Sequence, residues 1–225
     1  MTNTLHRFGK PESLEDDFIV FVLASRVNYM GAPEKVTKFL KAALKYNPVN
    51  IGNGSTGAMY QPEDDLSFAK VYFSGRKEKL TSEEIIKALE ESMAATVVFD
   101  NRESFAGFLK EVKEMDMGLS INASALADET RDACAKGGIT IHSVEYSLGF
   151  LGDLYRLPDR HTLALTTMCG HGLISGNFAR KLIDRVKEAR LTPEKAAGYM
   201  AKFCVCGAFN TSRAVRILNE ARMAN

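Results

Sequence analysis

The stretch Asp17-Phe-Ile-Val-Phe-Val-Leu-Ala24 decides the fold class of this chain. Its six central residues, Phe18 to Leu23, are all apolar and belong to the β-branched, aromatic and aliphatic types that favour strands. A continuous apolar run of this length is typical of a strand with both faces buried, because a half-exposed strand alternates apolar and polar residues. The chain is therefore organised around a buried strand close to its N-terminus.

Four further strand-like segments follow this strand, and most are separated by helix-like segments. The predicted strands cover residues 68–73, 95–99, 119–124 and 139–146. The predicted helices cover residues 33–46, 81–92, 104–115 and 128–136. Strands that alternate with helices indicate βαβ units, so we predict an α/β fold with a mostly parallel sheet of about five strands. An α+β sheet of ferredoxin-like type is the alternative, because several of the predicted helices are short.

The character of the sequence changes near residue 150. From Asp159 onward every periodic segment is helix-like, and a connector containing glycine, proline and tyrosine precedes it at 149–158. The predicted helices cover residues 159–165, 173–189, 193–203 and 211–221. We therefore predict a sheet domain over residues 1–150 and a helical subdomain over residues 151–225.

Two short clusters of cysteine and histidine stand out in the helical part. They are Met168-Cys-Gly-His-Gly172 and Phe203-Cys-Val-Cys-Gly207, and together they contain three of the four cysteines. Two predicted helices separate the clusters, and the second begins at Thr192-Pro193, where Thr192 suits an N-cap. A short connection between helices favours an antiparallel pair, so we expect the second cluster to return toward the first.

These residue types at this spacing point to a metal centre. Three cysteines and one histidine could close a Cys₃His zinc site, and the ligands would be Cys169, His171, Cys204 and Cys206. The same cysteines could instead hold an iron–sulfur cluster with His171 or an open iron at the fourth position. The choice between zinc and an iron–sulfur cluster stays open, because neither standard spacing is present.

Two interpretations without a metal compete with this one. Cys169 lies where a predicted helix starts, so it could be an acidified nucleophilic or redox thiol with His171 as its base. The cysteines could also simply be packed as small hydrophobic side chains, and we expect this for Cys134.

A loop and a second histidine complete the set of candidate site residues. The loop combines glycines and hydroxyls, which suits a backbone cradle for an anionic cofactor, although no P-loop or dinucleotide motif is matched. Its residues are Gly52, Asn53, Gly54, Ser55 and Thr56. His142 lies in the predicted strand 139–146, and it becomes a candidate general base if that strand ends toward the cysteine clusters.

Composition limits the partners of the chain. The net charge of its 225 residues is +1, which gives no electrostatic reason to expect a nucleic acid or an anionic membrane surface as a partner. No apolar run approaches the roughly 20 residues of a membrane helix, and the N-terminal ten residues have no apolar signal core. We expect a cytoplasmic protein with a small-molecule substrate, and a homo-oligomer stays open.

The sequence therefore predicts an intracellular enzyme with a cysteine-ligated metal centre. The reaction would be redox transfer or Lewis-acid chemistry on a small polar substrate, with Cys169, His171 and His142 as the catalytic residues. One alternative is a metal-free thiol enzyme that uses Cys169. Another is a non-catalytic α/β module for ligand binding or assembly, in which the cysteines have only a structural role.

Overall fold

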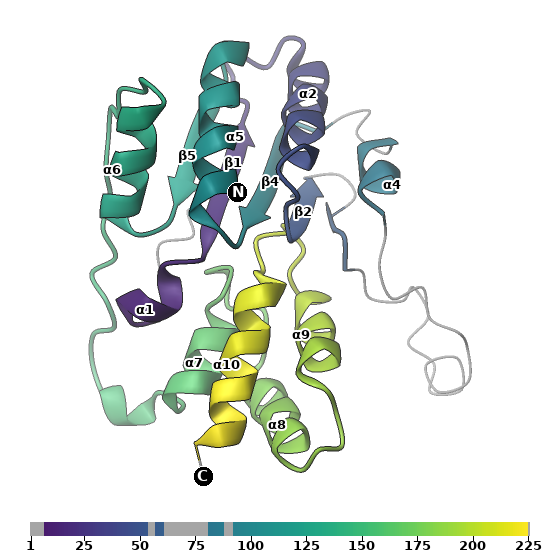
Figure 1. Cartoon of the computed structure of the whole chain (residues 1–225), viewed down its shortest axis with the longest axis vertical. Helices are drawn as coiled ribbons and strands as arrows, with labels where there is room; N and C mark the ends of the chain where they lie inside the picture. The colour runs from purple at the N-terminus through teal and green to yellow at the C-terminus, as the bar shows by residue number, and fades with distance from the viewer. Residues whose placement is uncertain (1–6, 54–56, 61–80, 88–91, 225) are drawn as a thin grey trace.

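The computed structural model describes residues 7–53, 57–60, 81–87 and 92–224 (Figure 1). Within this part of the chain, five strands form one sheet in the order β3-β2-β4-β1-β5. The strands are β1 (Phe18–Leu23), β2 (Asn50–Asn53), β3 (Gly57–Ala58), β4 (Ala94–Phe99) and β5 (Ser120–Ser124). Each strand is antiparallel to its neighbours in the sheet.

The prediction of a mostly parallel sheet is therefore wrong. Strands β1 and β2 are joined by α2 (Ala32–Leu44) and run in the same direction, but the antiparallel strand β4 lies between them. In the same way, α5 (Arg102–Met115) joins β4 to β5, and β1 lies between those two strands. This split βαβ arrangement preserves the alternation of strands and helices along the chain while it makes every hydrogen-bonded neighbour antiparallel.

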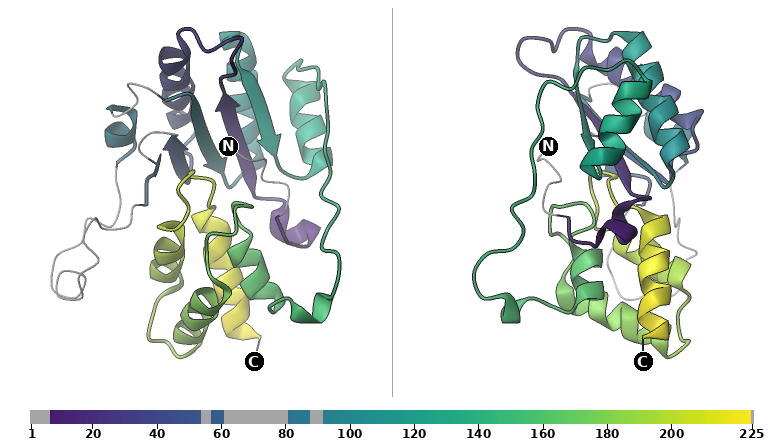
Figure 2. Two further views of the ribbon diagram at one scale, coloured as in Figure 1. Left: turned by 180° about the vertical axis from the view of Figure 1, so that it is seen from behind. Right: turned by 60° about the vertical axis from the view of Figure 1, so that its left-hand side comes forward.

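One predicted strand has no counterpart among the described residues, and another cannot be compared. The segment 139–146 forms no strand, and it runs through solvent along one side of the molecule after α6 (Ala127–Lys136) (Figure 2). The predicted strand over 68–73 lies outside the described residues. Conversely, β2 and β3 were not predicted, because their asparagine and glycine residues are depleted in strands.

The sheet is covered on both faces, and this explains the continuous apolar run in β1. Phe18, Val20 and Val22 belong to one core cluster together with residues of α2 and α5. Ile19 and Phe21 point to the other face and belong to a second cluster, which contains residues of the C-terminal helices. All five side chains are buried, as predicted for this strand.

The C-terminal helices gather beyond one end of the sheet (Figures 1 and 2). They are α7 (Arg160–Thr166), α8 (Gly176–Lys187), α9 (Pro193–Ala201) and α10 (Thr211–Met223). The predicted N-cap at Thr192 is confirmed, since its side chain accepts a hydrogen bond from the backbone N–H of Lys195. Helix α10 packs against α7, α8 and α9. The division into two domains at residue 150 stays a prediction.

Two short helices complete the described elements, α1 (Pro11–Leu14) and α4 (Ser82–Lys87). A 3₁₀ turn, η1 (Leu154–Arg156), lies between the exposed segment and α7. Across the described residues, no helix combines the length and the apolar character that a membrane crossing requires.

Candidate metal centre

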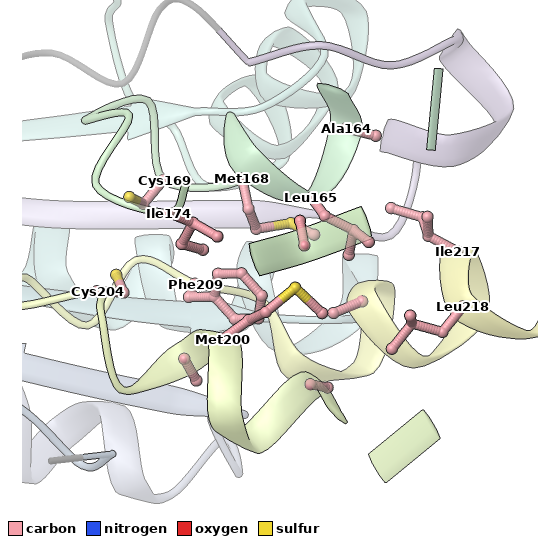
Figure 3. Packing of buried hydrophobic residues seen from close by; sticks show 14 of the residues in the cluster. Ala164, Leu165, Met168, Cys169, Ile174, Met200, Cys204, Phe209, Ile217 and Leu218 are labelled. Carbon is pink, nitrogen blue, oxygen red and sulfur yellow. The ribbon is translucent and has the colours of Figure 1, made fainter. Parts of the chain in front are cut away.

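Two loops bring the cysteine clusters to the same place. After α7 the chain turns through residues 168–172, where Gly170 and Gly172 have left-handed φ angles of 78° and 67°. After α9 it returns through residues 203–207 before α10 begins. Cys169 and Cys204 lie at the same end of the apolar cluster that fills the helical part (Figure 3). The α8–α9 hairpin therefore returns the second cluster to the first.

Three atoms that can bind a metal lie close together in these loops. The Sγ atoms of Cys169 and Cys206 and one ring nitrogen of His171 all lie within 4.8 Å of one another. The Nδ1 atom of His171 is 3.5 Å from Cys206 Sγ, and Cys204 Sγ is 3.7 Å from Cys206 Sγ. Cys204 contacts this group but lies outside it. The three residues could hold a metal ion.

The Cys204–Cys206 and Cys206–His171 distances correspond to edges of a tetrahedron around one ion. Zinc bonds of ~2.3 Å to sulfur and ~2.0 Å to nitrogen place neighbouring sulfurs ~3.8 Å apart and a sulfur ~3.5 Å from a nitrogen. The Cys204–Cys206 distance of 3.7 Å and the Cys206–His171 distance of 3.5 Å are close to these values. An ion bound by Cys206 and His171 would therefore need little change in the distance between these two ligand atoms.

The group has a buried side and a solvent-facing side. Cys169 and Cys204 are only 2% and 1% exposed, whereas His171 and Cys206 are half-buried. An ion held here would be anchored in the core and reached from solvent past His171 and Cys206.

Hydrogen bonds among the thiols favour one thiolate, on Cys169. The side chains of Cys204 and Cys206 lower the pKa of Cys169, burial opposes this effect, and the backbone N–H of His171 lowers the pKa further. The pKa of Cys204 is raised by its contacts with Cys169 and Cys206 and by burial. Metals bind the deprotonated form of cysteine, so Cys169 is the thiol closest to its ligand state.

Two glycines allow the second cluster to lie directly against strand β2. A Cβ atom added to Gly52 would lie only 2.6 Å from the carbonyl oxygen of Cys206. A Cβ atom on Gly207, whose φ is +74°, would collide with the backbone of residues 51 and 52. The backbone of the sheet therefore fixes the position of the loop that carries Cys206.

The predicted anion cradle at residues 52–56 stays a prediction. Gly52 and Asn53 belong to β2, whereas Gly54, Ser55 and Thr56 lie outside the described residues. The Asn53 side chain is buried, and its amide donates to the carbonyl of Ile85 at 3.4 Å.

A buried ionic network, which the sequence analysis missed, supports both loops. Asp17 and Arg213 form a fully buried ion pair at 2.8 Å, and Arg7 pairs with the same carboxylate. The Nε atom of Arg7 donates to the carbonyl of Met168 at 3.1 Å, next to Cys169. The sequence did contain a signal, because Arg213 lies on the otherwise apolar face of α10.

Two amides complete the support of the second loop. Asn210 caps α10 and donates to the Asp17 carboxylate at 3.0 Å. The buried Asn50 of β2 donates to the carbonyl of Phe209 at 3.0 Å. The chain that follows Cys206 is therefore tied to the starts of both β1 and β2.

The remaining candidates lie elsewhere or make other contacts. His142 is exposed in the segment after α6, where it lines a cavity of about 630 Å³ beside β5, and its role as a general base stays a prediction. The hydroxyls of Thr166 and Thr167, which precede Cys169, donate to carbonyls of α7. Cys134 is buried in the core cluster under α5, as predicted.

Comparison of the chain with known protein families, with curated proteins and with solved structures finds no match. No role of a residue can therefore be transferred from a relative, and the interpretation of the site depends on its own geometry.

Proposed function

We propose that this protein is an enzyme with a mononuclear zinc centre held by Cys169, His171 and Cys206. The ion would act as a Lewis acid on a small polar substrate. The observation that supports this proposal is the group of three ligand atoms within 4.8 Å of one another, brought together from two separate loops. Three protein ligands with a fourth position left for water or substrate are the usual arrangement of a catalytic zinc site.

The exposure of the ligands favours chemistry at this ion. His171 and Cys206 are half-buried, so a small molecule could approach from their side, whereas Cys169 is buried and anchors the site. Gly170 and Gly172 have no side chains, so the backbone on both sides of His171 is open to close approach. A bound substrate oxygen could therefore come close to the ion.

A single ion also agrees with the short distances better than an iron–sulfur cluster does. A cluster distributes its cysteine ligands over several iron atoms, which separates most of the sulfurs beyond the span of one ion. The distance of 3.5 Å between Cys206 Sγ and His171 Nδ1 instead corresponds to one edge of a tetrahedron around a single ion. Zinc also suits a mixed set of thiolate and imidazole ligands.

The first experiment measures the metal content of the purified full-length chain, together with its visible absorption. We expect one zinc per colourless chain. Cys206→Ser should lose the zinc, because it removes a ligand of the group, whereas Cys134→Ala should keep it, because Cys134 lies in another core cluster. A chain with no metal, equal zinc in both variants, or the visible absorption of an iron–sulfur cluster would contradict the proposal.

A structural zinc site is the second candidate, and the 3.7 Å distance between Cys204 and Cys206 favours it. With Cys204 as a fourth ligand the site would be closed, as structural Cys₃His sites are. Cys204→Ser distinguishes the candidates. The catalytic site should retain zinc in this variant and still accelerate hydrolysis of an activated ester above the rate of Cys206→Ser, whereas a closed site should lose zinc.

A further inference from the structure

The segment that follows α6 exposes an unusual amount of apolar surface. Of the fifteen large apolar side chains that are exposed in the described residues, seven lie between residues 141 and 155. They are Ile141, Val144, Tyr146, Leu148, Leu151, Leu154 and Tyr155, and Tyr155 is fully exposed. A concentration of this kind is typical of an interaction surface, because isolated exposed apolar residues are scattered.

The same segment has the sequence of a strand but lacks a strand partner in the structure. Residues 139–146 read Ile-Thr-Ile-His-Ser-Val-Glu-Tyr, which is rich in β-branched residues. They belong to none of the described strands of the sheet. A connection of this length, from the end of α6 to the start of α7, is uncommon unless it has a function.

Strand β5, at one edge of the sheet, is a strand with which this segment could pair. Strand β5 pairs with β1 on one side, and within the described part of the chain the sheet ends there. The cavity of about 630 Å³ separates β5 from residues 139–147, and both line it. An exposed edge is a template for another strand, and natural proteins usually cover it.

We propose that residues 139–155 form a dimerisation arm, whose strand-like part pairs with β5 of a second copy of this chain. Each copy carries an arm and, within the described residues, a strand β5 that pairs with another strand on one side only. In a two-fold dimer, the arm of each copy would pair with β5 of the other. Charge does not oppose it, because the net charge of each chain is only +1. Residues of both charge signs line the cavity, namely Lys113, Arg131, Asp116 and Glu145, which gives no preference for a strongly charged partner.

The exposed area is sufficient for such a dimer. At roughly 170 Å² for each large residue, the seven exposed residues present on the order of 800 Å² of accessible surface. A standard interface buries about 800 Å² on each partner. The backbone hydrogen bonds of a strand pair would add to this area.

The test is sedimentation of the full-length chain over a wide range of concentration, with matched variants. We expect a dimer for the unchanged chain. Val144→Asp and Leu148→Asp should weaken the dimer at least about tenfold, because a carboxylate would enter the interface. Met223→Asp is the control, since Met223 is 75% exposed at the far end of α10 and should leave the dimer unchanged.

Hydrogen exchange locates the contact. In the dimer, the amides of β5 and of residues 139–146 should exchange at least about tenfold more slowly than in the dissociated chain. A chain that stays monomeric at every concentration would overturn the proposal. The same holds for a dimer that Val144→Asp and Leu148→Asp leave intact, and for a monomer in which both strands are protected, because the arm would then pair with its own β5.

Discussion

At the scale of single residues, Gly207 is where the second cysteine loop touches the sheet. Its φ of +74° is a conformation that side chains disfavour, and its backbone is packed against that of Gly52. Glycine is therefore required at this position for two separate reasons: the positive φ angle, and the lack of room for a Cβ atom. The sequence placed Gly207 beside Cys206, but it could not show that Gly52 lies next to it, because 155 residues separate the two glycines.

Gly207→Ala should lower the free energy of unfolding by more than the dihedral penalty alone. That penalty is about 1–2 kcal/mol for a residue forced into the left-handed region. Gly118→Ala measures it in isolation, because Gly118 has a φ of +65° and an added Cβ would meet no atom within 4 Å. Urea denaturation of both variants gives the comparison. An equal decrease in the free energy of unfolding of the two variants would show that the close approach to Gly52 does not contribute to stability.

At the scale of elements, α10 is anchored to the start of β1 by the ion pair of Asp17 and Arg213. Burial lowers the pKa of Arg213, and the charge of Asp17 opposes this. A buried pair of this kind contributes little by itself, but loss of one partner leaves an uncompensated charge in the core. The network thereby holds in position the loop that follows α7 and the loop that precedes α10.

Asp17→Asn should destabilise the fold by about 3–5 kcal/mol, because it leaves Arg213 and Arg7 without their carboxylate. Asp16→Asn is the matched control on the neighbouring residue. Asp16 pairs with Arg216 at the surface, where the side chains are 46% and 40% exposed, so its loss should cost less than about 1 kcal/mol. Urea denaturation of both variants gives their free energies of unfolding. Similar decreases in the two variants would mean that the buried pair does not anchor α10.

Elements that depend on local patterns were predictable, and their pairing was not. The apolar run from Phe18 to Leu23, the Thr192 cap and the helices after residue 159 follow from propensity and periodicity, which act over a few residues. The insertion of β4 between β1 and β2 depends on contacts between distant segments, which alternation of helices and strands cannot reveal. The strand predicted at 139–146 has the right residue types, but among the described residues no strand pairs with this segment.

At the scale of the whole molecule, the candidate metal centre lies where the sheet and the helical part meet. The short connection between the two predicted helices led us to expect the cysteine clusters to converge, and the structure places the sulfurs of residues 169, 204 and 206 together. The contribution of the sheet could not be foreseen, because Asn50 and Gly52 lie more than 150 residues before the loop they support. A metal ion here would therefore stabilise the junction as well as provide chemistry.

The most direct test of the central claim is X-ray absorption spectroscopy of the metal in the purified full-length chain. The account predicts one zinc ion with two sulfur ligands at ~2.3 Å and imidazole nitrogen at ~2.0 Å, completed by a light atom. The two sulfurs would belong to Cys169 and Cys206, and the nitrogen to His171. A metal surrounded only by oxygen and nitrogen, or a chain that binds no metal when zinc is supplied, would contradict it.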